Sequence, residues 1–346
     1  MTLGSKVMGN RGIDRRDRAE DGPACRPTSL PVPRIDVAPL VAGEWNSSDA
    51  HDARAQMRKA CAEIGFMTIV GHGIPRARTA ALSGAANDFF ALPDAEKFEV
   101  SPRRWWPDSP NVYRGYFPST VAGKEGLDIG DPELREPALL SRPYHERNLL
   151  PSALGPSWAE AVSDAFAALS ALAATLLGGL VAALGGDAQR VPAAFARPAA
   201  LSTLRFNFYP ERQEPVALAR DDGTPLCCEA HVDSGLLTVL HQDEVGGLQV
   251  RDGEGRWRTI APDPKALVVN TGLALQRMTR GELVATTHRV LHSRRQRLSI
   301  PFFHEPVPDF VMSPASLGLP HRPPEDPPCY EDFLRRSLGK FSEYAR

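Results

Sequence analysis

A charge-free segment in the middle of the chain limits the folds that are open to it. From Ala165 to Gly186 there is no acidic or basic residue, and leucines recur among many alanines. A segment of this length can span a bilayer. However, alanine and glycine add little hydrophobic drive, Gly178-Gly179 weakens the middle, and the leucines fall mainly at three- and four-residue spacings. Because this spacing is typical of a helix with one apolar face, we expect a core helix rather than a membrane span.

The segment after this helix has the rhythm of a β-sandwich or barrel. Between about residues 199 and 306, short apolar runs alternate with turn-forming pairs such as Asp222-Gly223 and Asp252-Gly253. The preceding region, about 33–190, is predicted to be helical, and 307–346 is predicted to form a proline-rich loop and a closing helix over 330–344. We therefore expect an α+β chain with a sheet-rich core flanked by helices on both sides in sequence.

Composition excludes several classes of protein. Residues 1–32 mix arginines with acids and contain no apolar run, so they predict a disordered tail rather than a targeting segment. A net charge of −2 gives no electrostatic footprint for nucleic acid or an anionic membrane. Five cysteines without regular spacing favour a reducing compartment. We expect a cytoplasmic protein, monomeric or weakly homo-oligomeric, with no nucleic-acid or membrane partner.

Three side chains in the sheet-rich region suit ferrous iron. His231 and Asp233 point to the same face if their segment is a strand, and His288 lies in a second β-branched run. Two imidazoles and one carboxylate leave coordination positions open, as in non-haem Fe(II) oxygenases. Structural zinc sites, in contrast, are closed by four ligands. The periodicity alone also allows His292 as the third ligand, and this alternative stays open at this point.

An arginine nine positions after His288 suits an acidic co-substrate. The planar guanidinium of Arg297 can bind a carboxylate through two parallel hydrogen bonds. Ser299 shares its face if the segment is a strand. The alternative is that Arg297 is one solvated charge in the basic cluster 294–297.

An ordered series of short motifs runs along the chain from about residue 33 to residue 305, and it is far more specific than any one motif. In this order the motifs resemble the isopenicillin N synthase-like family of Fe(II)/2-oxoglutarate-dependent oxygenases. They are Arg34-Ile35-Asp36-Val37, Ala62-Glu63-Ile64-Gly65-Phe66, Gly71-His72-Gly73-Ile74-Pro75, Tyr113-Arg114-Gly115-Tyr116, Lys124-Glu125, Asp128-Ile129-Gly130, Asn207-Phe208-Tyr209-Pro210, His231-x-Asp233, Gly246-Gly247-Leu248-Gln249-Val250, Asn270-Thr271-Gly272, Thr287-His288-Arg289-Val290 and Arg297-Leu298-Ser299-Ile300-Pro301-Phe302-Phe303.

The resemblance implies a fold and a set of ligands. The fold is a double-stranded β-helix, or jelly roll, flanked by N-terminal helices and a C-terminal helix. The family's third iron ligand aligns with His288 rather than His292. Iron(II), 2-oxoglutarate and O2 are the implied cofactors and co-substrates. Residues that match the family's contacts to 2-oxoglutarate are Arg297, Ser299, Tyr209 and Asn207. Leu273 departs from the pattern, since an aspartate is common at its position.

The implied activity is oxidation of a small molecule, by hydroxylation, desaturation or ring formation, with release of succinate and CO2. Specialised metabolism is the expected setting. A 2-oxoglutarate-independent iron oxidase, an ethylene-forming variant and a non-catalytic binding module are the alternatives. The mix of aromatic and arginine side chains suggests a partly apolar substrate with a carboxylate. The candidates for substrate contact are Tyr113, Arg114, Tyr116, Arg205 and Phe303.

Overall fold

The computed structural model describes residues 32–320, 325–339 and 344. The tail predicted for residues 1–32 therefore lies outside the described residues, apart from Val32. The last part of the helix predicted over 330–344 does so as well. Within the described part of that segment, helix α10 runs from Tyr330 to Leu338.

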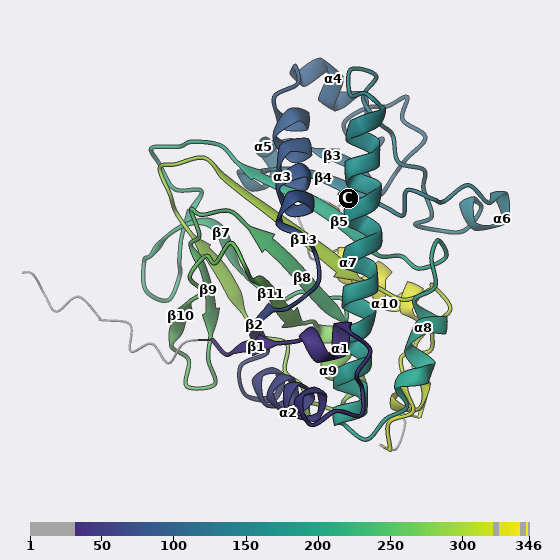
Figure 1. The fold of residues 1–346 in the computed structure, drawn as a ribbon. Helices are drawn as coiled ribbons and strands as arrows, with labels where there is room; N and C mark the ends of the chain where they lie inside the picture. Colours follow the sequence, from purple (N-terminus) through teal and green to yellow (C-terminus); the bar gives the residue numbers. More distant parts are fainter. Residues whose placement is uncertain (1–31, 321–324, 340–343, 345–346) are drawn as a thin grey trace, which may run out of the picture.

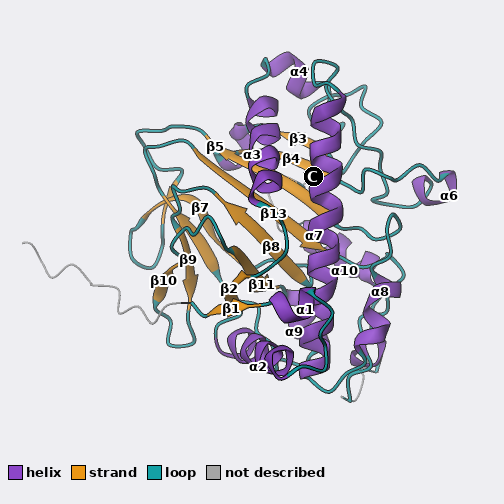
Figure 2. Ribbon diagram, in the orientation of Figure 1, coloured by secondary structure: helices purple, strands orange, loops and turns teal. Residues whose placement is uncertain are grey.

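Two β-sheets face each other, and helices cover the outer face of the larger one (Figures 1 and 2). The smaller sheet has the order β10 (Trp257–Thr259), β9 (Leu248–Arg251), β12 (His288–Leu291), β7 (Pro225–His231) and β6 (Ala217–Leu218). The larger sheet has the order β1 (Arg34–Asp36), β2 (Phe66–Val70), β11 (Leu267–Thr271), β8 (Leu237–Gln242), β13 (Arg297–His304), β5 (Thr203–Tyr209), β4 (Glu125–Ile129) and β3 (Gly115–Phe117).

The larger sheet combines strands of the sheet-rich region with strands of the N-terminal region that was predicted to be helical. Strands β1 to β4 come from the region predicted to be helical, and they extend the sheet at both edges. At one edge β2 pairs with β11, and at the other β4 pairs with β5, both antiparallel. The N-terminal region is therefore continuous with the sheet-rich region through backbone hydrogen bonds, and residue 190 does not divide the sheet.

The charge-free segment lies within α7 (Pro156–Ala183), which runs across the outer face of the larger sheet against β8 and β13 (Figure 1). It is long and apolar enough to cross a membrane, but 67% of its apolar window is buried inside the structure, as is typical of a core helix. Phe166 packs edge-on against Phe302 of β13, with ring centroids 5.1 Å apart. A Cβ on Gly179 would meet Leu40 at 3.3 Å, so this glycine permits the close approach of α1. The glycine pair thus serves packing.

The remaining helices surround α7 or cap the ends of the sheets. The two longest, α2 and α3, lie in the region predicted to be helical and pack against α7. Their bounds and those of the shorter helices are α1 (Ala38–Val41), α2 (Ser48–Glu63), α3 (Arg76–Phe90), α4 (Asp94–Phe98), α5 (Ser119–Ala122), α6 (Pro137–Leu140), α8 (Val191–Ala194) and α9 (Leu273–Met278), with 3-10 turns η1 (Ala188–Arg190) and η2 (Pro314–Leu317).

Two apolar clusters hold these layers together. The larger cluster lies between the helices and the larger sheet. The smaller cluster lies between the two sheets, where Leu240 and Val268 of one sheet meet Leu248, Val250 and Val290 of the other. Burial of each such side chain stabilises the fold by about 1.5–3 kcal/mol. The space beside this smaller cluster holds the candidate site.

Candidate active site

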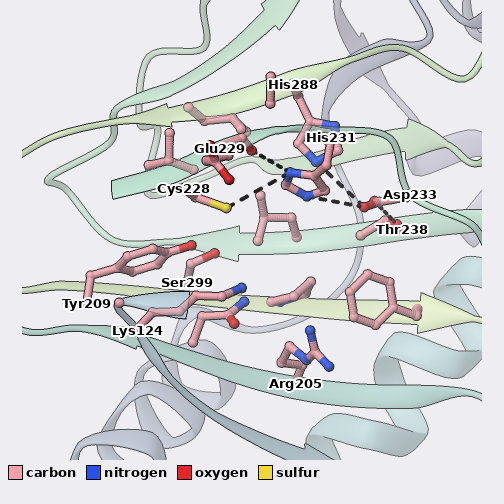
Figure 3. Close-up of a pocket in the computed structure, with 18 of the residues that line it drawn as sticks. Lys124, Arg205, Tyr209, Cys228, Glu229, His231, Asp233, Thr238, His288 and Ser299 are labelled. Carbon is pink, nitrogen blue, oxygen red and sulfur yellow. Dashed lines mark hydrogen bonds and ion pairs between the residues drawn. The ribbon is translucent and has the colours of Figure 1, made fainter. Parts of the chain in front are cut away.

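The three predicted iron ligands come together from two strands of the smaller sheet and an adjoining loop. His231 is the last residue of β7, His288 is the first residue of β12, and the two are paired across the sheet. Asp233 lies in the loop that leads to β8, so the strand expected to hold both motif residues ends at His231. One donor atom from each residue lies within 4.8 Å of the other two. Figure 3 shows the three side chains pointing toward one another.

Backbone carbonyls orient both imidazole rings. Nδ1 of His231 lies 2.9 Å from the carbonyl oxygen of Glu229, and Nδ1 of His288 lies 3.2 Å from that of Thr286. A ring that donates from Nδ1 keeps its lone pair on Nε2. The two Nε2 atoms lie 3.8 Å and 3.6 Å from Oδ1 of Asp233. Both lone pairs are therefore directed to the same place.

Two neutral donors fix the carboxylate. Oδ2 of Asp233 accepts hydrogen bonds from the Thr238 hydroxyl at 2.6 Å and from the Asn270 amide at 2.8 Å. These bonds leave Oδ1 facing the histidines. The backbone N–H of Leu273 donates to the Asp233 carbonyl oxygen at 2.8 Å. The loop is thus anchored at this position through the main chain, whatever side chain residue 273 carries.

The electrostatics of the triad favour a cation at its centre. Burial lowers the pKa of His288 to about 4, and the charge of His231 acts in the same direction. Burial raises the pKa of Asp233, but the two histidines and the hydrogen bonds to Oδ2 outweigh it and hold the pKa below its ordinary value. Burial also lowers the pKa of His231, yet Cys228 and Asp233 outweigh it and raise the pKa to about 9. Since a metal ion needs neutral imidazole ligands, its binding would release this proton.

Two other histidines of the sheet-rich region, which include the alternative ligand His292, lie elsewhere. Nε2 of His292 is 3.2 Å from the carbonyl oxygen of Gln213, away from the triad. Nε2 of His241 is 3.0 Å from the Ser83 hydroxyl. Over residues 32–320, 325–339 and 344, the only group with metal-ligand spacing is the triad that contains His288. Geometry thus favours His288 over His292 as the third ligand.

One wall of the cavity beside the triad is built by β5 and β13. The cavity has a volume of about 980 Å³. The two strands pair antiparallel, and every second residue faces the cavity, as strand geometry requires. The pairing aligns Tyr209 with Arg297 and Asn207 with Ser299 at one end, and Thr203 with Phe303 at the other. All four residues predicted to contact 2-oxoglutarate therefore line the same end.

Arg297 is prepared to bind an anion at this end. Its side chain is buried, Nε donates to the Gly246 carbonyl oxygen at 2.6 Å, and the guanidinium carbon lies 4.9 Å from the centroid of the Tyr209 ring. Gly246 and Gly247 both have positive φ, the conformation that glycine tolerates best, in the turn that presents this carbonyl. Among the described residues, Nη1 of Arg297 and Oδ1 of Asn207 have no hydrogen-bond partner. Lys124 lies with Tyr209 and Ser299 in Figure 3.

The predicted substrate contacts divide into two groups. Tyr113, Arg205 and Phe303 line the cavity. Arg114 and Tyr116 are absent from its lining: the Arg114 guanidinium donates to a hydroxyl and to main-chain carbonyls, and the Tyr116 hydroxyl donates to Glu125 at 2.6 Å. Arg114 and Tyr116 lie within three residues of Tyr113 along the chain, and their bonds hold them in the packed structure behind the wall.

Several residues of the site were missed from the sequence. Thr238 stands alone as a polar residue in an apolar run, and this signal could have identified it. Glu305 continues the period-two series that begins at Arg297, and this alternation could have identified it. Asn270 appeared as part of a motif without a role. Each of these three residues contacts the triad or lines the cavity.

Comparisons with known proteins agree with this geometry. Residues 200–306 match the model of the 2OG-Fe(II) oxygenase superfamily, and residues 32–153 match that of the non-haem dioxygenase in morphine synthesis N-terminal family. Isopenicillin N synthase of Streptomyces griseus is 29% identical over 320 residues, with 88% of this chain and 94% of the relative covered. A 2-oxoglutarate-Fe(II) type oxidoreductase of Emericella nidulans is 32% identical over 353 residues, with 92% and 93% covered.

Solved structures show the same fold. A full-length Neurospora crassa protein, crystallised in complex with alpha-KG and 5-formyluracil, aligns with a TM-score of 0.73 at 22% identity, covering 88% of this chain and 95% of that one. The sequence relatives extend over nearly the whole chain, and the triad occupies the cavity of the matched region. The chain therefore belongs to the 2OG-Fe(II) oxygenase superfamily and is an oxidoreductase that uses iron(II) and 2-oxoglutarate.

Proposed function

We propose that the enzyme oxidises a C–H bond of a small molecule, with His231, Asp233 and His288 as the iron ligands. The observation that carries this proposal is that two imidazole lone pairs and one carboxylate oxygen face one another in a cavity. The same cavity holds a guanidinium nitrogen that has no hydrogen-bond partner in the described part of the chain. In hydroxylation, 2-oxoglutarate, O2 and R–H would give succinate, CO2 and R–OH. Desaturation or ring closure would release water instead.

The donor set suits iron(II). Two histidines and one carboxylate are the ligands of the facial triad and leave other coordination positions open. Bound iron would supply the oxidative chemistry. The chain's own residues orient the ligands: carbonyl oxygens fix both rings, and Thr238 and Asn270 fix Asp233. Such outer contacts hold ligands in a binding geometry before the metal arrives.

The co-substrate end suits a dicarboxylate. We assign Arg297, Ser299, Tyr209 and Asn207 to 2-oxoglutarate, with Arg297 on the carboxylate far from the iron. The free Nη1 of Arg297 and the cation of Lys124 at the same end support this assignment. A buried guanidinium binds a carboxylate strongly because both groups lose competing water.

The other end is assigned to the substrate, with Tyr113, Arg205 and Phe303 as proposed contacts. The two facing sheets support a double-stranded β-helix, with jelly-roll strands over 199–306. We further propose a cytoplasmic location and a monomeric or weakly associated protein. The even charge balance and the irregular cysteines support these two proposals.

An anaerobic titration of the iron-loaded protein with 2-oxoglutarate tests the proposal. We expect a visible charge-transfer band with wild type and none with His231→Ala, which should not retain iron. Absence of the band in wild type would contradict the 2-oxoglutarate assignment and leave a 2-oxoglutarate-independent oxidase or a binding module. When air is admitted, succinate and ethylene measured in the same vial separate substrate oxidation from ethylene formation.

A further inference from the structure

The strand that carries the co-substrate contacts ends at an unassigned carboxyl group. Arg297, Ser299, Pro301 and Phe303 face the cavity at every second position of β13, and Glu305 follows them in the same series. Glu305 is buried, with 5% of its surface exposed, and it lines the cavity at the end away from Arg297. It therefore lies at the proposed substrate end, not at the co-substrate end.

The carboxyl group of Glu305 lacks the partners that a buried acid normally has. Among the described residues, neither its Oε2 nor the hydroxyl of Tyr330 beside it has a partner at hydrogen-bond distance, although Tyr330 is close enough to lower the pKa of the carboxyl. Buried polar groups of proteins are nearly always hydrogen-bonded, so an unsatisfied one at a cavity wall points to a ligand. Burial raises the pKa of this carboxyl to about 7, against the opposing effects of Tyr330, Arg114 and Arg205. Near neutral pH it can therefore present either a charged or a neutral acid.

The cations at this end are already bound within the protein. Nε and Nη2 of Arg205 donate to the two carboxylate oxygens of Asp128 at 2.5 Å and 2.7 Å. Arg114 donates to the Thr203 hydroxyl and to the Leu201 carbonyl oxygen, both at 2.9 Å. A substrate carboxylate would have to compete with these bonds. A hydrogen-bond donor would meet a carboxyl that has open acceptor positions.

The carboxyl of Glu305 also lies beside the loop that carries Asp233. A Cβ on Gly235 would lie 3.4 Å from Oε1 of Glu305, and Gly235 is two residues after Asp233. The aromatic rings of Tyr113 and Phe303 line the same end of the cavity. A small ring held by Glu305 would thus lie between aromatic faces and the proposed iron ligands.

We propose that the enzyme selects a nitrogen-bearing substrate whose N–H group donates a hydrogen bond to the carboxyl of Glu305. This inference rests on the proposed function and replaces the substrate carboxylate expected from the sequence. A carboxyl fork can engage an ammonium group or an N–H beside a carbonyl through both oxygens, whereas a single hydroxyl engages one. An ammonium ion would pair with the charged acid, and an amide-like edge with the neutral acid.

Matched ring compounds test the recognition on the metal-free protein. The probes are piperidine and its quaternary analogue N,N-dimethylpiperidinium, 2-piperidone and N-methyl-2-piperidone, and cyclohexanecarboxylate. Saturation-transfer NMR titrations would measure their affinities without iron or turnover. We expect at least one N–H compound to bind about tenfold or more tightly than its methylated partner, the size of effect given by one hydrogen bond to a buried polar group. Equal binding within both pairs, or preferred binding of cyclohexanecarboxylate, would overturn the proposal.

Substitutions at Glu305 identify which donor is bound. Glu305→Leu should abolish the preference for N–H compounds. Glu305→Gln should keep lactam binding within about threefold and weaken amine binding about tenfold or more, because the amide keeps an acceptor but loses the charge. Glu254→Gln, an equal change at an exposed turn, is the control. A preference that survives in Glu305→Leu would exclude Glu305 as its source.

The co-substrate titration separates this inference from the proposed function. With iron and 2-oxoglutarate, all three variants should retain the charge-transfer band, and melting temperatures should show that each is folded. A band without any N–H preference would overturn the substrate inference alone. Loss of the band in wild type would overturn the proposed function itself.

Discussion

The two ends of the cavity are built by the same pair of strands with the same alternation, yet their charges are arranged in opposite ways. At one end, within the part of the chain that the structure describes, the guanidinium of Arg297 bonds only to neutral groups and keeps Nη1 unsatisfied. At the other end the guanidinium of Arg205 is neutralised by Asp128, and one oxygen of the acid Glu305 has no partner among residues 32–320, 325–339 and 344. Residue type alone would assign both arginines to anions. The bonds that each arginine makes within the protein support anion binding only for Arg297.

The largest expected effect on ligand binding is at Arg297. Replacing it with alanine should raise the dissociation constant of 2-oxoglutarate about 100-fold, because a charge-assisted pair is lost in a buried place. Arg297→Lys should recover only part of this, leaving a loss of about tenfold, since an ammonium group cannot form the planar two-bond pair. The anaerobic charge-transfer titration measures both.

A matched control lies in the same basic cluster. The side chain of Arg295 is 67% exposed and pairs with an exposed Glu244, so Arg295→Ala should leave the dissociation constant unchanged. If Arg297→Ala bound 2-oxoglutarate with wild-type affinity, the carboxylate would have to bind elsewhere, and the contrast between the two ends of the cavity would be lost.

The next effect is on stability at the substrate end. Asp128→Asn would leave the guanidinium of Arg205 buried without its counter-charge, and we expect a loss of about 4 kcal/mol in the free energy of unfolding. Urea unfolding followed by circular dichroism measures it. Asp309→Asn removes the same charge from an exposed pair with Arg142 at 3.6 Å and should cost less than about 1 kcal/mol. Equal losses in the two variants would show that Arg205 is not held by Asp128 and is open to a substrate anion.

The structure groups all four residues of the proposed co-substrate end, as the sequence predicted, but only three of the five proposed for the substrate end, and the reason is physical. Alternation along a strand puts Arg297 and Ser299 on one face, and the ordered motifs identified Tyr209 and Asn207 as their neighbours. The pairing of β5 with β13 then aligns these residues, as the structure shows. Strand alternation was sufficient to predict this grouping because the position of each residue depends on the strand that holds it.

In other parts of the chain, the structure depends on contacts between segments that are distant in sequence, and these contacts could not be predicted from local patterns. Asp128 and Arg205 lie 77 positions apart, and only the pairing of β4 with β5 brings them together. Strands β1, β3 and β4 of the N-terminal region were missed for the same reason: β1 and β3 have three residues each, and their identity as strands depends on their partners in the sheet. The core helix was predicted because its leucine spacing is a local signal.

The smaller of the two expected effects on stability is a pH dependence that comes from Glu305. Its pKa in the folded protein is about 7, because burial raises it from an ordinary value of 4.5. The folded state therefore binds the proton more tightly than the unfolded state. Stability is highest below the unfolded pKa and is lost as pH rises from about 4.5 to about 7, by at most about 3 kcal/mol.

Glu305→Gln should remove this loss, so its advantage over wild type should grow across that range and be constant above it. Urea unfolding at a series of pH values measures the difference, with Glu254→Gln as the control. Parallel curves of stability against pH for wild type and Glu305→Gln would mean that the carboxyl is solvated or paired within the protein. The substrate end would then hold no unsatisfied acid, and this difference between the two ends of the cavity would be lost.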